Sequence, residues 1–138
     1  MNTKTILAGF AGGVFAFFAG WLIFGILLMD FMMGHTTMYD GLMKDPPDFV
    51  FIIISNLAYG LFLAYVFDKW ADARTLASGF TKGLIISLFI TVYFDASMYA
   101  FYNLFDMTAL LTDVVMGSIF GGLIGAVVGL VLGSGKKG

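Results

Sequence analysis

The chain has 138 residues, of which 60% are apolar and only 12% are charged, and its mean hydropathy is +0.96. About a quarter of the residues of a soluble domain are normally charged, so this composition excludes an ordinary water-soluble globule. The formal net charge is only −2, and no basic patch suggests a nucleic-acid partner. Composition therefore predicts a polytopic membrane protein whose main partner is the lipid bilayer.

The chain offers few chemically reactive groups. It has no cysteine, one histidine and one arginine, and all nine acidic residues are aspartates. Disulfides, thiolate metal sites and thiol nucleophiles are excluded, and a glutamate base or a multi-histidine centre lacks its parts. We therefore expect no enzyme reaction and no cofactor.

Four apolar stretches follow one another along the chain, at residues 6–33, 49–67, 80–104 and 109–133. Crossing a hydrocarbon core of about 30 Å takes about 20 helical residues, so each stretch can span a membrane. The first is too long for a signal peptide and precedes no cleavage motif, so we interpret it as a retained span. The sequence predicts one all-α domain, residues 1–138, folded as a four-helix transmembrane bundle.

Basic residues fall in the N-terminal, middle-loop and C-terminal segments, which share one side when the chain has four spans. They are Lys4, Lys69, Arg74, Lys82, Lys136 and Lys137, whereas Lys44 lies on the other side. The positive-inside rule then places both termini in the cytoplasm. The outer side carries Asp30, Asp40, Asp45, Asp48, Asp106 and Asp113. Such a surface attracts cations, although the positive-inside bias also produces it passively.

A glycine pair in the first span recurs in the third. Gly9-Phe10-x-x-Gly13 matches Gly79-Phe80-x-x-Gly83. The match indicates either a parallel repeat of two helices per unit or a coincidence in a chain rich in glycine and phenylalanine.

The fourth span carries a ladder of glycines at every fourth position, namely Gly117, Gly121, Gly125, Gly129 and Gly133. Small residues let membrane helices approach closely and gain packing contacts, because lipid gives them little hydrophobic drive to associate. We expect the ladder to pack on the first span, which carries Gly9 and Gly13, or alternatively to form an interface between subunits.

Asp95 lies deep inside the third predicted span, about 20 Å along the helix from Lys82. A carboxylate at such a depth is costly unless it is paired, hydrated or protonated, so it is a candidate functional group. Helical spacing and depth suggest a polar pocket open to the outside, or else a protonated Asp95 that only fixes helix packing. The pocket candidates are Asp95, Thr91, Ser87, Asn56, Ser55, Tyr59, Tyr99 and Tyr102.

Methionines gather near the outer end of the first span, where Met29, Met32, Met33 and Met38 surround His35 in the sequence. Thioethers with one imidazole suit Cu(I), which makes these residues candidate metal ligands. Methionine is equally a common filler of apolar cores.

Several short segments carry a resemblance to known proteins: Trp21-Leu-Ile-Phe-Gly25, Leu27-Leu-Met-Asp30-Phe31, Asn56-Leu-Ala-Tyr-Gly60 and Lys69-Trp70-Ala71. With them the chain resembles a group of small four-span bacterial inner-membrane proteins without a known activity. The resemblance implies a multi-pass protein of the bacterial inner membrane and adds no mechanism.

Three functional hypotheses follow. The first is a non-catalytic accessory or assembly subunit of a larger membrane complex, or a homo-oligomer held by the glycine ladder. The second is a small oligomeric transporter or channel for protons or cations that uses Asp95. The third is an outer-face Cu(I)-binding protein that uses the methionines and His35.

Overall fold

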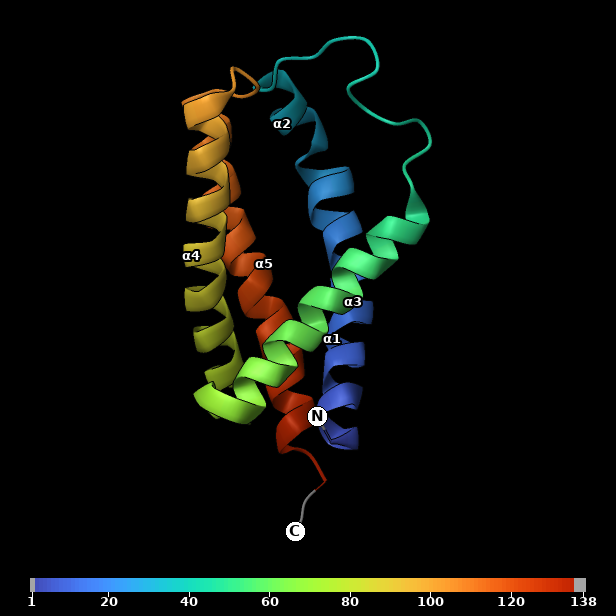
Figure 1. The fold of residues 1–138 in the computed structure, drawn as a ribbon, viewed down its shortest axis with the longest axis vertical. Coiled ribbons are helices and arrows are strands. Elements are labelled where there is room, and N and C mark those ends of the chain that lie inside the picture. Colours follow the sequence, from blue (N-terminus) through green and yellow to red (C-terminus); the bar gives the residue numbers. More distant parts are fainter. Residues whose placement is uncertain (1, 136–138) are drawn as a thin grey trace.

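The computed structural model describes residues 2–135 and contains four long helices (Figure 1). They are α1 (Thr3–Leu22), α3 (Phe49–Val66), α4 (Leu76–Phe101) and α5 (Met107–Gly133). Two π-helical turns, η1 (Ile23–Leu27) and η2 (Phe67–Ala71), extend α1 and α3, and a short helix, α2 (Met29–Gly34), follows η1. All four long helices are apolar and long enough to cross a membrane. The predicted all-α fold with four spans is thus confirmed.

Polar side chains at the helix starts explain where each long helix begins. The side chains of Asn2, Asp48 and Asp106 accept hydrogen bonds from backbone N–H groups in the first turns of α1, α3 and α5. Thr75 and Ser78 cap each other at the start of α4. Such caps satisfy donors that have no partner within the helix. Because Thr75 supplies its cap, α4 begins at Leu76, four residues before the predicted residue 80.

The first predicted span, residues 6–33, is interrupted. The Leu28 N–H donates to the Ile23 carbonyl at 2.9 Å, which is the spacing of a π-helical turn. The chain then restarts as α2, so the membrane-spanning part of this segment is Thr3–Leu27.

The bundle has two different ends (Figure 1). Both ends of the described chain and the loop between η2 and α4 lie at one end, which we call the terminal end. The loops 35–48 and 102–106 lie at the opposite end, which we call the acidic end. The acidic end carries Asp40, Asp45, Asp48 and Asp106. Lys136 and Lys137, two of the predicted basic residues, lie outside the described residues.

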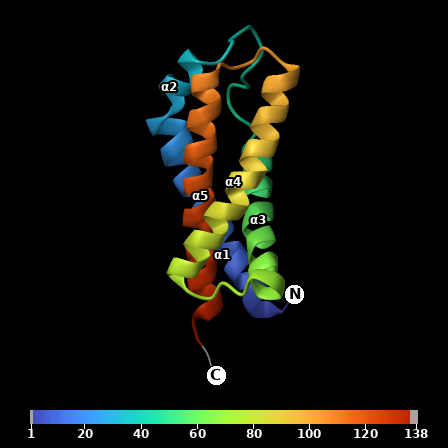
Figure 2. The ribbon, with the colours of Figure 1, turned by 90° about the vertical axis from the view of Figure 1, so that its left-hand side faces the viewer.

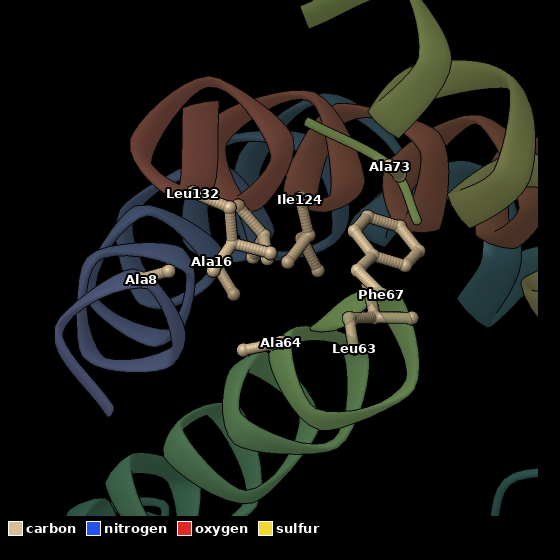
Figure 3. Packing of buried hydrophobic residues seen from close by; sticks show 9 residues of the cluster. Ala8, Ala16, Leu63, Ala64, Phe67, Ala73, Ile124 and Leu132 are labelled. Atoms are coloured by element: carbon tan, nitrogen blue, oxygen red, sulfur yellow. The ribbon is translucent and has the colours of Figure 1, made fainter. Parts of the chain in front are cut away.

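The long helices form two pairs that pack differently. α4 and α5 pack against each other over much of their length and stand apart only near the acidic end, whereas α3 crosses α1 and moves well away from it towards that end (Figures 1 and 2). The two pairs meet in an apolar core in the terminal half of the bundle. There Leu63 and Phe67 are fully buried and pack with Ile124, Val128 and Leu132 (Figure 3).

The partner of the glycine ladder differs from our expectation. A Cβ atom placed on Gly125 would lie 3.0 Å from the Gly83 Cα, and one on Gly129 would lie 3.1 Å from the Gly79 Cα. The ladder therefore packs on α4, not on α1 as expected. Gly9 and Gly13 of α1 instead contact α3, where Gly60 and Leu57 face them. The reason is that α4 carries its own small residues at the matching positions, so both backbones can approach.

At the acidic end, two loops hold the pairs together. The Asp106 N–H donates to the His35 carbonyl at 3.0 Å, and the Thr37 N–H donates to the Leu104 carbonyl. The His35 Nδ1 atom also lies 2.7 Å from the Asp106 carboxylate. The Ala109 N–H at the start of α5 and the His35 ring hold the pKa of Asp106 below its usual value.

Candidate functional site

The antiparallel register of α4 and α5 defines the candidate site. Four residues along α4, spaced by four, each face a glycine of α5. The facing positions are Gly79 with Gly129, Gly83 with Gly125, Ser87 with Gly121, and Thr91 with Gly117. From the terminal end, the α4 positions of this register are therefore two glycines, which have no side chain, followed by two residues that carry hydroxyl groups.

The next step of the same register brings two carboxyl groups together. Asp95 follows Thr91 by four residues, and Asp113 precedes Gly117 by four residues. The Asp95 and Asp113 side chains lie within hydrogen-bonding reach of each other. Asp95 was expected to stand alone among the spans, so its acidic neighbour is a feature that only the structure supplies.

The carboxyl pair lies inside the apolar part of both helices. Asp95 is six residues before the end of α4, and Asp113 is six residues after the start of α5. Six residues correspond to about 9 Å along a helix, so both groups lie at the same level, displaced from the middle of the helices towards the acidic end. Each side chain is half-buried in the bundle.

No basic group balances the pair within residues 2–135. The ion pairs found there join His35 to Asp106 and Arg74 to Asp68 and Asp72. The Asp95 Oδ2 atom is fully buried and accepts no hydrogen bond from the described residues. Two neighbouring carboxylates repel each other strongly. One proton shared between them removes the repulsion and supplies a hydrogen-bond donor. The arrangement suits one proton or one small cation.

Hydroxyl groups continue from the pair towards the middle of the bundle. Thr91 lies one turn below Asp95, and Ser87, which is fully buried, lies one turn further. Ser87 shares a short hydrogen bond with the Tyr59 hydroxyl group, which arrives from α3. Beyond Ser87 the glycines Gly83 and Gly79 pack directly on the backbone of α5. The row of oxygen atoms therefore ends halfway through the bundle and does not reach the terminal end.

The chain matches no protein-family model, no curated protein and no solved structure. Its candidate site must therefore be interpreted from its own geometry.

The predicted pocket residues separate into three groups. Ser87, Thr91 and Asp95 lie along the α4–α5 contact, and Tyr59 joins them through Ser87. Ser55 and Asn56 instead donate to the Ile52 carbonyl of their own helix, at 2.9 and 2.8 Å, in the half of α3 that moves away.

Tyr99 and Tyr102 are exposed near the acidic end. The Tyr99 ring lies against Phe105. Tyr102 lines an open pocket of about 430 Å³ together with Tyr39 and Met98. Met98 lies about one turn beyond Asp95, so this pocket is on the acidic-end side of the carboxyl pair.

The candidate copper ligands lie in different surroundings. The His35 Nδ1 atom faces the Asp106 carboxylate, and the ring packs beside Phe31. Met29 lines a groove between α1 and α3, whereas Met33 and Met38 are exposed and Met32 is half-buried. Among the described residues, no three His, Asp or Glu side chains gather as a possible metal site.

Asp113 is the site residue that the sequence interpretation missed, because it was counted only among the acidic residues of the outer side. A signal was present. Asp113 occupies the next position of the four-residue series that starts at Gly133, and Asp95 extends the series Gly79, Gly83, Ser87 and Thr91 in the same way. When both series are continued towards the short loop that joins the two spans, the next position of each is an aspartate, and the two aspartates face each other.

Proposed function

We propose that this protein is a small proton- or cation-coupled membrane protein whose ion-binding site is the Asp95–Asp113 carboxyl pair. The observation that carries the proposal is the contact of two carboxyl groups, one with a buried oxygen that lacks a partner, inside membrane-spanning helices. Intramembrane carboxyl groups without a basic partner are costly and typically belong to ion or proton pathways. In this proposal the pair shares one proton and exchanges it with a cation or with solvent.

Exchange at this site takes place from the acidic end. An open pocket lined by Met98 lies on the acidic-end side of the pair, whereas beyond Ser87 the glycines of α4 pack directly on the backbone of α5. Transfer across the membrane would therefore need a rearrangement of α4 against α5. The positive-inside rule supports an acidic end that faces away from the cytoplasm. The sequence resemblance to small four-span bacterial proteins supports a location in the inner membrane.

Infrared spectroscopy of the protein in lipid vesicles tests the proposal. The wild type is expected to show a protonated carboxyl C=O band that persists at neutral pH. Because the two groups share one proton, Asp95→Asn and Asp113→Asn should each abolish this band, although each variant retains one carboxyl group. Asp30→Asn is the matched control, since Asp30 is exposed on α2 and should leave the band unchanged.

Proton uptake into the same vesicles, driven by a potassium diffusion potential, shows whether binding is coupled to transport. We expect uptake with the wild type and with Asp30→Asn, and none with either pair variant. The proposal is wrong if both carboxyl groups of the wild type are ionised at neutral pH and no cation is bound. Binding without uptake would retain the site and reject transport.

The assembly-subunit hypothesis rested on the glycine ladder. The ladder glycines from Gly117 to Gly129 lie against α4, so a partner subunit or a second copy would have to bind another surface. The copper hypothesis rested on methionines near His35, whose Nδ1 atom is already bonded to Asp106. The carboxyl pair is therefore the feature that best supports a function.

A further inference from the structure

A groove of about 500 Å³ lies between the acidic halves of α1 and α3. Its walls are mainly apolar and aromatic and include Phe17, Trp21, Phe24, Phe49 and Ile52. Figures 1 and 2 show that α3 moves away from α1 and η1 in this half of the molecule. The groove is independent of the carboxyl pair, which lies between the other two helices.

The groove lies at the depth of one lipid leaflet. Phe17 is ten residues before Leu27, where the first membrane-spanning segment ends, and Phe49 is the first residue of the second. Ten helical residues correspond to about 15 Å, which is half of a hydrocarbon core of about 30 Å. The groove therefore extends from the acidic-end surface to about the middle of the membrane.

Packed elements hold the groove open. At the crossing point, a Cβ atom on Gly60 would lie 3.0 Å from the Gly13 Cα, so the two backbones touch there and the crossing point of α1 and α3 is fixed. Above the crossing, Gly25 leaves room for the Trp21 ring to lie against its own helix, because a Cβ atom would be 3.2 Å from the Trp21 Cδ1. The groove thus begins at a backbone contact and continues towards the acidic end between walls of large side chains.

We propose that this groove is a binding site for one acyl chain of a lipid from the leaflet at the acidic end. The wall is apolar, the surrounding medium is hydrocarbon, and the length matches one leaflet. A partner helix about 10 Å in diameter or a second copy is the competing occupant, and it would shield Trp21 from lipid. Asn56, a polar residue of the wall, already donates to its own helix and so does not require a polar ligand.

Tryptophan quenching by lipids with brominated acyl chains tests this site. The chain has two tryptophans, so Trp70→Phe leaves Trp21 as the only one. Trp70 is 72% exposed, and phenylalanine preserves its aromatic character. The comparison protein combines Trp21→Phe and Trp70→Phe with Val115→Trp. Val115 lies at a similar depth on an exposed face of α5, with 56% exposure against 62% for Trp21.

In detergent micelles to which brominated phosphatidylcholine is added stepwise, Trp21 is expected to reach half-quenching at a lipid fraction about threefold lower than the tryptophan at 115, because the groove retains lipid where the exposed face exchanges it for detergent. Ile52→Phe, which fills the groove, should remove this difference. Asn56→Phe serves the same purpose if Ile52→Phe does not fold.

Equal quenching at the two positions overturns the proposal, because the groove then holds only ordinary boundary lipid. Weaker quenching at Trp21 also overturns it, because protein then covers the groove. A preference that survives both groove-filling variants shows that the groove does not cause it. None of these outcomes depends on the carboxyl pair.

Discussion

The two helix pairs, α1 with α3 and α4 with α5, both pack through glycines at the terminal end. Their packing differs only towards the acidic end. In α1 and α3, close backbone contact is concentrated where Gly60 meets Gly9 and Gly13. In α4 and α5, glycines or small polar residues face each other from Gly79 to Thr91. One pair consequently crosses and opens a groove, whereas the other stays together and brings two aspartates into contact.

The difference shows how the length of a small-residue series controls helix geometry in a membrane. A single close approach fixes the crossing point but leaves the angle free to be set by the larger side chains on either side. A repeated close approach keeps the backbones adjacent over several turns, so the groups at the end of the series also meet. Each pair thus offers a different kind of site, apolar in the first and charged in the second.

The largest expected effect comes from breaking the repeated approach. In Gly125→Ala the new Cβ atom would collide with the Gly79 carbonyl and lie 3.0 Å from the Gly83 Cα, so the backbones must separate. We expect a loss of about 3 kcal/mol or more, at the upper end of overpacking costs, measured by unfolding in mixed micelles. Gly34→Ala is the control, because nothing lies within 4 Å of its new Cβ atom. Equal stability of the two variants would mean that α4 and α5 are not in close contact.

An engineered disulfide between α4 and α5 tests the same contact by strengthening it. A Cβ atom on Gly117 would lie 3.8 Å from the Thr91 Cβ, which is the usual Cβ separation in disulfides. Because the chain has no cysteine, Thr91→Cys with Gly117→Cys should oxidise without competition and raise stability by about 3 kcal/mol. Gel mobility before and after reduction measures the bond.

The matched pair for α1 and α3 is Trp21→Cys with Ile52→Cys, placed on opposite walls of the groove. This pair should remain reduced under the same conditions. If both pairs oxidise equally well, the two helix pairs do not differ at the acidic end as described.

The smallest effect concerns the contact that joins the two pairs at the acidic end. Asp106→Asn keeps a side chain that can cap α5 but removes the charge that faces His35. Because folding lowers the pKa of Asp106, its charge contributes stability above the ordinary value of 3.8, and this contribution disappears as the pH falls through the lowered value.

The wild type should therefore have a slightly higher thermal midpoint than Asp106→Asn at neutral pH, and the two midpoints should converge well below pH 3.8. Scanning calorimetry of both proteins across this range measures the difference. A difference that persists well below pH 3.8 would contradict the assignment.

Sequence alone was sufficient for the class of fold. Apolar stretches of about 20 residues must form helices in lipid, because a backbone in hydrocarbon has to satisfy its own hydrogen bonds. The same reasoning identified Asp95, since its cost in a membrane is a local property of its span. The π-helical turn at Ile23–Leu27 could not be predicted in the same way, because one extra residue in a helical turn leaves the hydropathy of the segment unchanged.

Partners between helices were decided by the tertiary structure. The glycine ladder allows close packing on any helix with small residues, and both α1 and α4 carry a glycine pair. Only the packed bundle selects α4, which faces the ladder at four matched positions, whereas Gly9 and Gly13 of α1 pack on α3. That selection brings Asp113 to Asp95 and leaves the groove beside α1. The length of an apolar span is a property of one segment and can be read from its sequence. Which residue faces Asp95 depends on which helices pack together and in which register.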